Sequence, residues 1–99
     1  MNKGEITVKD VTMFYLESCG YCDKAFRALE ELYEKKPAYR DVSITKIEES
    51  QQPEIAERYD YYAVPSFYID GEKRFEAHLF MGYEEIRAEV EKVLEEALA

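Results

Sequence analysis

Cysteine occurs at only two positions of the chain, Cys19 and Cys22, with Gly-Tyr between them. The run before them, residues 11–16, is apolar and rich in β-branched and aromatic side chains, which predicts a buried strand. After Cys22, apolar residues recur at spacings of three and four with charged residues between them, which predicts an amphipathic helix that ends near Pro37. The two thiols therefore lie where a strand gives way to a helix.

The start of this helix is a favourable place for a reactive thiol. The first turn of a helix has unpaired backbone N–H groups and carries the positive end of the helix dipole, and both stabilise an anion. A thiolate is such an anion, so we expect Cys19 to ionise more readily than a free cysteine. Cys22 follows about one helical turn later, close enough to attack a mixed disulfide formed at Cys19. The spacing predicts a dithiol redox site.

Other uses of the cysteines are open at this point. Free cysteine is often a small buried residue without chemistry, although a single Cys-x-x-Cys pair at a strand-to-helix junction is atypical of that role. A closed zinc site normally has four ligands, and beyond the two cysteines the chain offers only His78. Zinc would then need carboxylates or a second chain, so we predict no metal site in the single chain. An iron–sulfur cluster that bridges two chains is the second functional hypothesis.

The length and the cysteine content predict one domain over residues 1–99. A chain of 99 residues can bury a core without a stabilising disulfide, and two cysteines do not resemble the disulfide framework of a small secreted protein.

Residues 1–10 contain no apolar run typical of a signal peptide, and no run reaches membrane-spanning length. We therefore expect a cytoplasmic protein without a membrane partner, in a compartment where a Cys-x-x-Cys pair is more often catalytic than structural.

The chain is acidic, with a formal net charge of −9 from 22 acidic and 13 basic residues. Binding to a nucleic-acid backbone needs an excess of lysine and arginine, so we expect no nucleic-acid partner. Most of the acidic residues fall on predicted helix faces, where they indicate a solvated surface. We expect the protein to act as a monomer.

The remaining elements alternate between strands and helices. They are a strand over 41–47, a short helix over 53–59, a strand over 66–69, a returning strand over 73–80 that includes His78, and a helix over 83–98. Asp70-Gly71, between the last two strands, is a strong signal for a hairpin turn. The order β-α-β-α-β-β-α predicts an α/β protein with a mixed sheet and helices packed on its faces.

The strand–Cys-x-x-Cys–helix start, the Val64-Pro65 step before the third strand and the order of the elements resemble the thioredoxin superfamily. The similarity extends over nearly the whole chain, and the size is most like that of small bacterial thioredoxin-like and glutaredoxin-like proteins. The resemblance implies a thioredoxin-like fold, with a mixed four-stranded sheet and helices on both faces.

The resemblance also implies a role for each residue of the expected site. In this superfamily the first cysteine is the nucleophile and the second resolves the mixed disulfide, which gives these roles to Cys19 and Cys22. Pro65 would be cis and would lie beside the cysteines, where the backbone of Val64 pairs with an extended substrate. Glutaredoxins commonly have tyrosine at the third position of the motif, which places Tyr21 among the substrate-binding residues.

The activity implied by the resemblance is that of a thiol–disulfide oxidoreductase, acting as a dithiol reductant or electron carrier. Its substrate would be a disulfide-bearing protein or small molecule. Its electrons would come from a reductase or from glutathione, and no bound cofactor is expected. The alternative is a glutaredoxin-like carrier of an iron–sulfur cluster or of glutathione, with Cys19 from two chains among the cluster ligands.

Several positions differ from the patterns of the superfamily. Thioredoxins have Trp before the motif and Gly-Pro inside it, whereas this chain has Ser18 and Gly-Tyr. Their buried Asp, six residues before the nucleophile, corresponds to Met13. The Thr-Val-Pro of glutaredoxins becomes Ala63-Val64-Pro65, and their later Gly-Gly is missing. The electron donor therefore stays open between a thioredoxin reductase and glutathione.

Three further side chains near the expected site have two interpretations each. Tyr61 and Tyr62 would flank the cysteines, either as an aromatic floor for a peptide or as anchors of their loop. Glu17 is the nearest acid in sequence, and it would either act on the proton of Cys22 through water or be an ordinary surface carboxylate.

Overall fold

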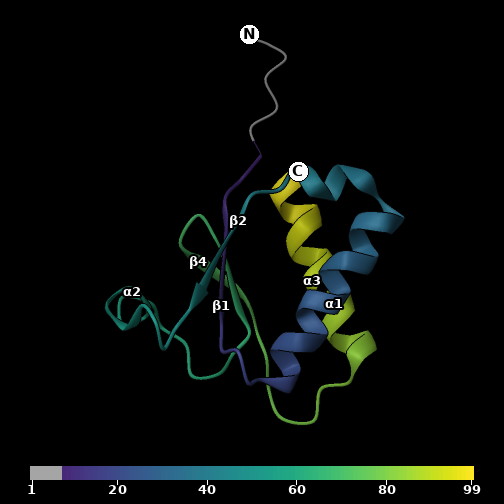
Figure 1. The fold of residues 1–99 in the computed structure, drawn as a ribbon. Helices are drawn as coiled ribbons and strands as arrows, with labels where there is room; N and C mark the ends of the chain where they lie inside the picture. Colours follow the sequence, from purple (N-terminus) through teal and green to yellow (C-terminus); the bar gives the residue numbers. More distant parts are fainter. Residues whose placement is uncertain (1–7) are drawn as a thin grey trace, which may run out of the picture.

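A mixed sheet of four strands, in the order β2-β1-β3-β4, forms the centre of the computed structural model, which describes residues 8–99 (Figure 1). The strands are β1 (Val11–Tyr15), β2 (Ile44–Glu48), β3 (Ser66–Ile69) and β4 (Glu72–Glu76). β1 pairs in parallel with β2 and antiparallel with β3, and β3 pairs antiparallel with β4. The predicted mixed four-stranded sheet is confirmed.

Helices cover both faces of this sheet (Figure 1). α1 (Gly20–Lys35) and α3 (Tyr83–Leu98) pack together on one face, and the short α2 (Pro53–Ala56) lies on the other. A short 3-10 helix, η1 (Pro37–Asp41), follows α1. The predicted order of elements and the helices on both faces are confirmed.

β1 carries mostly apolar side chains, with Thr12 as the exception, because both faces of the sheet are covered. Val11 and Met13 are fully buried in the larger core, together with side chains of α1 and α3. Phe14 is fully buried in the smaller core on the α2 face, where its ring centroid lies 4.7 Å from that of Tyr59 and 4.9 Å from that of Tyr61. Burial on both sides fixes β1, and thereby the point at which the chain leaves the sheet for the cysteines.

One buried carboxylate holds the loop between β1 and α1. Glu48, the last residue of β2, accepts a hydrogen bond from the backbone N–H of Glu17 at 3.0 Å and one from the N–H of Ser50 at 2.8 Å. Donation by the Ser50 hydroxyl, and by these N–H groups, holds the pKa of Glu48 below its usual range in spite of burial. The loop that leads to Cys19 is therefore tied to the end of β2.

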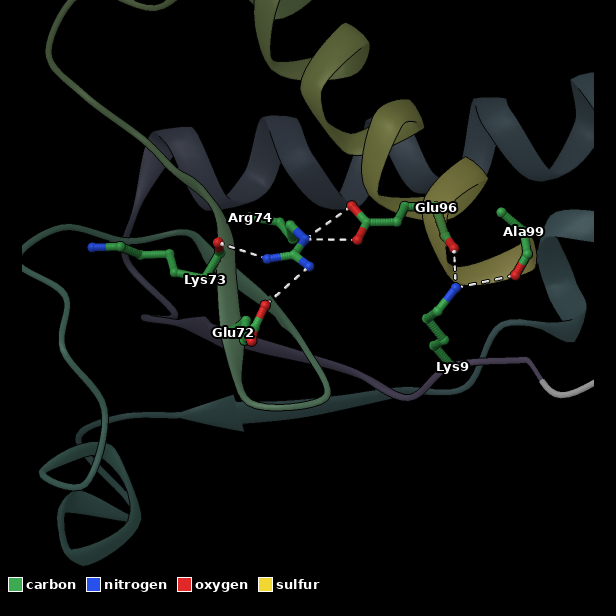
Figure 2. Close-up of polar contacts among 6 residues, drawn as sticks. All are labelled: Lys9, Glu72, Lys73, Arg74, Glu96 and Ala99. Atoms are coloured by element: carbon green, nitrogen blue, oxygen red, sulfur yellow. Dashed lines mark hydrogen bonds and ion pairs between the residues drawn. The ribbon is translucent and has the colours of Figure 1, made fainter.

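The C-terminal turn of α3 is attached to the sheet by polar contacts (Figure 2). Arg74 of β4 donates from Nε to Glu96 Oε2 at 2.7 Å and from a terminal nitrogen to Glu72 at 3.3 Å. Lys9 Nζ donates to the backbone carbonyls of Glu96 at 3.2 Å and Ala99 at 3.0 Å, at a helix end where the last carbonyls lack partners from a following turn. These partly exposed contacts orient the helix, and each stabilises the fold by less than about 1 kcal/mol.

The hairpin predicted at Asp70-Gly71 is confirmed. The φ angles are +50° at Asp70 and +86° at Gly71, and a two-residue turn with both residues in the left-handed region is typical of type I′. Asp and Gly adopt this region at low cost, which explains why these residue types join β3 to β4.

The strand predicted over 41–47 has the wrong boundaries. The observed strand, β2, begins at Ile44, because η1 continues to Asp41 and the backbone N–H of Val42 still donates to the carbonyl of Tyr39 at 3.2 Å. The chain therefore forms a turn up to Val42, although its apolar and polar residues alternate there as they would in a strand.

The helix predicted over 53–59 is too long, since α2 ends at Ala56. The N–H of Tyr59 donates to the carbonyl of Ala56 at 3.0 Å, which is the spacing of a tight turn rather than of an α-helix. The ring of Tyr59 packs against Phe14 in the smaller core, and this contact turns the chain toward the sheet.

The returning strand predicted over 73–80 is also too long, and β4 ends at Glu76. Its neighbour β3 begins directly after Pro65, which has no N–H with which to extend the ladder. The N–H of Ala77 still donates to the carbonyl of Pro65 at 3.0 Å. His78 therefore lies in the exposed loop after β4 and not on the strand.

Tyr39 of η1 joins the C-terminal halves of α1 and α3. It is 1% exposed, and its hydroxyl lies 2.7 Å from Glu91 Oε2 and 2.6 Å from Glu95 Oε2. The same two carboxylates pair with Lys35 and Lys36, each at 2.8 Å. Burial raises the pKa of Tyr39, and the hydrogen bonds to the two carboxylates raise it further.

Replacing Tyr39 by Phe should lower the free energy of unfolding by about 2 kcal/mol, because a hydrogen bond to charged groups is lost. The pKa of Tyr39 is raised in the folded protein, so the stabilisation is present below the unfolded pKa of about 10 and is lost as the pH rises above it. Urea unfolding at pH 7 and pH 11 measures both effects. Tyr33→Phe, at a half-buried tyrosine, is the control, and equal losses in the two variants would contradict this role.

Candidate active site

Cys19 is the N-cap residue of α1, with extended backbone angles of φ −114° and ψ 117°. Its Sγ accepts a hydrogen bond from the backbone N–H of Cys22 at 3.2 Å, and its carbonyl accepts one from the N–H of Asp23 at 3.0 Å. The sulfur thus takes the place of the side-chain oxygen that usually caps a helix. The side chain is partly exposed, so the sulfur lies at the open end of the helix and within reach of solvent, as the sequence predicts.

Cys22 differs from Cys19 in its surroundings. It is fully buried, and both cysteines are free thiols. Burial raises the pKa of Cys22, and its hydrogen bond with Cys19 raises it further. At neutral pH this residue is therefore a protonated thiol shielded from solvent, while its neighbour faces outward.

The Val64-Pro65 peptide bond is cis, as the resemblance implied. The thiol of Cys19 lies 3.7 Å from the carbonyl oxygen of Val64, to which it donates a hydrogen bond. Pro65 is fully buried at the start of β3, and Val64 is partly exposed. The structure therefore brings Val64 and Pro65 to the cysteines from a distant part of the chain.

A carboxylate that the sequence analysis did not single out holds this loop. Glu76, the last residue of β4, accepts hydrogen bonds from the N–H groups of Tyr62 at 2.7 Å and Ala63 at 2.8 Å, and it pairs with Lys73 at 2.7 Å. Burial raises the pKa of Glu76, but Lys73 and the two N–H groups outweigh it and hold the pKa below its usual range. Glu76 thereby fixes the segment that leads into Val64.

Tyr21 lies in the first turn of α1, and its ring is half-buried. Its hydroxyl accepts a hydrogen bond from the backbone N–H of Phe80 at 2.7 Å, and the Lys24 ammonium lies 5.4 Å from its ring centroid. The sequence predicts a substrate-binding residue here, and the structure adds a contact with the loop after β4.

The two tyrosines before Val64 lie in different surroundings. Tyr61 stacks on Phe14 and donates from its hydroxyl to Glu49 at 2.6 Å, so it anchors the loop. Tyr62 is 93% exposed. Pockets of about 620 and 400 Å³ lie next to α2, and neither of these two is lined by a cysteine.

The position that carries a buried Asp in thioredoxins has no ionisable group in this chain. Met13 is fully buried there, paired in the sheet with Lys46 and Phe67. Glu17 is exposed and contacts Glu48 through its backbone N–H. Within residues 8–99, no three or more His, Cys, Asp or Glu side chains are grouped as metal ligands would be.

The glutaredoxin family model matches residues 11–74, which is more than half of the chain and includes both cysteines. The chain belongs to the glutaredoxin family. Members of this family and of the related thioredoxins are in general thiol–disulfide oxidoreductases, and the adjacent thiols of Cys19 and Cys22 give this glutaredoxin-family protein the same chemistry. A search of curated proteins gave no match.

Solved structures of thioredoxins have the same fold as this glutaredoxin-family protein. Oxidised mitochondrial thioredoxin 3 from Saccharomyces cerevisiae is 27% identical, with a TM-score of 0.63 over 91% of this chain and 79% of that chain. Fasciola hepatica thioredoxin is 24% identical, with a TM-score of 0.60 over 92% of this chain and 82% of that chain. The thioredoxin-like fold is therefore confirmed. In the part of the chain that the structure describes, no helix is both long and apolar enough to cross a membrane.

Iodoacetamide should label Cys19 faster than Cys22, by on the order of tenfold or more, between pH 6 and pH 9. The reason is that Cys22 is fully buried and its raised pKa keeps it protonated. Mass spectrometry of the quenched reaction measures the two rates, and the urea-unfolded protein, in which the two thiols should react alike, is the control. Labelling of Cys22 at the rate of Cys19 in the folded protein would contradict the unequal burial.

Replacing Glu76 by Ala should lower the free energy of unfolding by about 2 kcal/mol, because two backbone N–H groups lose a charged acceptor. Faster hydrogen exchange at the Ala63 amide should accompany the loss. Lys73→Ala is the matched control, since it removes only the ion pair and should cost less than about 1 kcal/mol. If both variants had the same effect on exchange at Ala63, Glu76 would not be the anchor of this loop.

Proposed function

We propose that this protein is a dithiol reductant or electron carrier that reduces disulfides through Cys19 and Cys22. The observation that carries the proposal is the contact between the two residues. The N–H of Cys22 donates to Cys19 Sγ at 3.2 Å, while the thiol of Cys22 is buried. One sulfur is available to a substrate, and the other is available only to its neighbour.

In the first step, the Cys19 thiolate attacks one sulfur of a substrate disulfide. The substrate S–S bond breaks, a mixed disulfide forms at Cys19, and one substrate thiolate leaves. Cys22 then gives its proton to that released thiolate and attacks Cys19 Sγ. The second substrate thiolate leaves, and the Cys19–Cys22 disulfide forms. Two electrons pass from the cysteine pair to the substrate. Its second thiolate takes a proton from solvent, so the substrate ends as two thiols.

The surface beside Cys19 would hold an extended substrate. Val64 is partly exposed and its carbonyl lies next to Cys19 Sγ, which supports backbone pairing with a substrate strand at this residue. Pro65 has no N–H and limits that pairing to one side. Tyr21 would border the same surface from the first turn of α1.

Regeneration of the two thiols needs an external reductant, either glutathione or a thioredoxin reductase. The two are distinguished by adding each to the protein with an oxidised Cys19–Cys22 pair and measuring the rate at which free thiols appear.

We propose that the protein acts as a cytoplasmic monomer on a disulfide-bearing protein or small molecule. A visible absorption band after anaerobic purification would support the alternative, an iron–sulfur carrier with Cys19 of two chains as ligands.

Replacing Cys22 by Ser should trap a mixed disulfide between Cys19 and the substrate, because attack needs Cys19 and release needs Cys22. Non-reducing electrophoresis with insulin, whose disulfide bonds are intact, as the probe measures the trapped adduct. Cys19→Ser is the matched control and should trap at least about tenfold less, because its remaining thiol is buried. Equal trapping by the two variants would overturn the assignment, and full turnover of Cys22→Ser with glutathionylated substrates would indicate a monothiol mechanism.

A further inference from the structure

Two large apolar side chains are exposed in the loop between β4 and α3. Leu79 is 72% and Phe80 is 91% exposed, whereas Ala77 and Met81 on either side of them are 3% exposed. Both ends of the loop are therefore anchored in the core, and only its middle extends into solvent. An exposed pair of this size beside a reactive group indicates an interaction surface.

The backbone of this loop is in an unusual conformation. Phe80 has a φ of +71°, in the left-handed region that residues other than Gly, Asn and Asp seldom adopt. Neither side chain is turned inward to gain burial in compensation. Contacts outside the loop must hold this conformation.

Tyr21 supplies such a contact from within the redox motif. Its hydroxyl accepts the hydrogen bond from the N–H of Phe80 at 2.7 Å, and the loop passes beside the first turn of α1 in Figure 1. Tyr21 follows Cys19 by two residues and precedes Cys22 directly. The hydrogen bond therefore connects the position of Leu79 and Phe80 to the position of the reactive sulfur.

The distribution of exposed apolar side chains favours a protein as the molecule that would cover these residues. Both loops that contact the redox motif carry large exposed side chains, with Tyr62 at 93% in the loop before Val64 and Leu79 and Phe80 in the loop after β4. Binding at an open surface needs contact area beside the reacting bond. A protein disulfide with an apolar segment next to it supplies that area.

We propose that the Tyr21 hydroxyl is a positioning group, which holds Leu79 and Phe80 outward so that they bind an apolar segment beside the disulfide of a protein substrate. The inference rests on the proposed reduction of disulfides at Cys19. Tyr21 acts through the loop, because its hydroxyl oxygen accepts the hydrogen bond from the N–H of Phe80.

The test compares two variants that separate the hydrogen bond from the apolar side chain. Tyr21→Phe removes the acceptor and keeps Phe80. Phe80→Asn keeps the backbone N–H and suits the left-handed conformation, but it removes the apolar ring. Each reduced protein is mixed with insulin or with cystine, and the second-order rate constant for formation of the Cys19–Cys22 disulfide is measured.

The ratio of the insulin rate constant to the cystine rate constant should fall about fivefold in each variant, which is the effect of one hydrogen bond or one modest apolar contact. The ratio in the double variant should fall by less than the product of the two single effects, since part of the effect of Tyr21 passes through the ring of Phe80. Hydrogen exchange at the Phe80 amide should become faster in Tyr21→Phe. Tyr39→Phe, which lowers stability far from the site, should leave the ratio within twofold of wild type.

Three outcomes would overturn the inference while leaving the proposed function intact. The first is an unchanged ratio of the insulin to the cystine rate constant in Tyr21→Phe, and the second is unchanged hydrogen exchange at the Phe80 amide. The third is a fully additive loss in the double variant, which would mean that Tyr21 touches the substrate itself. A wild-type protein that sediments as a dimer and becomes a monomer on Phe80→Asn would assign the loop to a second copy of the chain instead. Failure of the wild type to reduce either probe would overturn the proposed function and the inference together.

Discussion

The site depends on the unpaired N–H groups at the start of α1, which need an acceptor. Cys19 Sγ provides it for the N–H of Cys22 at 3.2 Å, so the helix is capped by the reactive atom itself. The elements around it hold this arrangement in place. β1, buried on both faces, ends just before the loop, and Glu48 ties that loop to β2 through Glu17. The helix then places Cys22 one turn after Cys19, with its side chain buried in the protein.

The same geometry makes the two cysteines unequal. Cys19 is at the open end of the helix, while Cys22 is directed into the protein and has no exposed surface. Burial raises the pKa of Cys22, and the buried residue at the position of the thioredoxin Asp is Met13, whose thioether cannot accept the thiol proton. In the proposed reaction the proton is therefore best transferred to the thiolate that the substrate releases. The first step then assists the second, because the thiolate released when Cys19 attacks is the base that deprotonates Cys22.

Local patterns predicted the parts of the fold that local interactions determine. The cysteine pair, the apolar strand before it and the Asp70-Gly71 hairpin follow from spacing and from backbone preference, and the structure confirms where they lie. The predicted ends of β4 and α2 were wrong because the end of β4 depends on Pro65 beside it in the sheet, and the end of α2 depends on the packing of the Tyr59 ring against Phe14. Local spacing specifies neither contact. Glu76 and the contact between Tyr21 and Phe80 gave no sequence signal, since side-chain bonds to distant backbone N–H groups have no characteristic spacing. Only the family resemblance implied the cis bond at Pro65.

Two loops contact the redox motif, one at Cys19 and the other at Tyr21, and each is held by one side chain that accepts from its backbone. Glu76 accepts from the N–H groups of Tyr62 and Ala63, and Tyr21 accepts from the N–H of Phe80. A bond to the backbone fixes the path of a loop without restricting which side chains the loop carries. The residues that would touch a substrate can therefore change while the sulfur, its helix and the two anchors stay in place. In the proposed reaction this would separate specificity from chemistry, because exposed residues on the loops would select the disulfide and the capped sulfur would carry out its reduction.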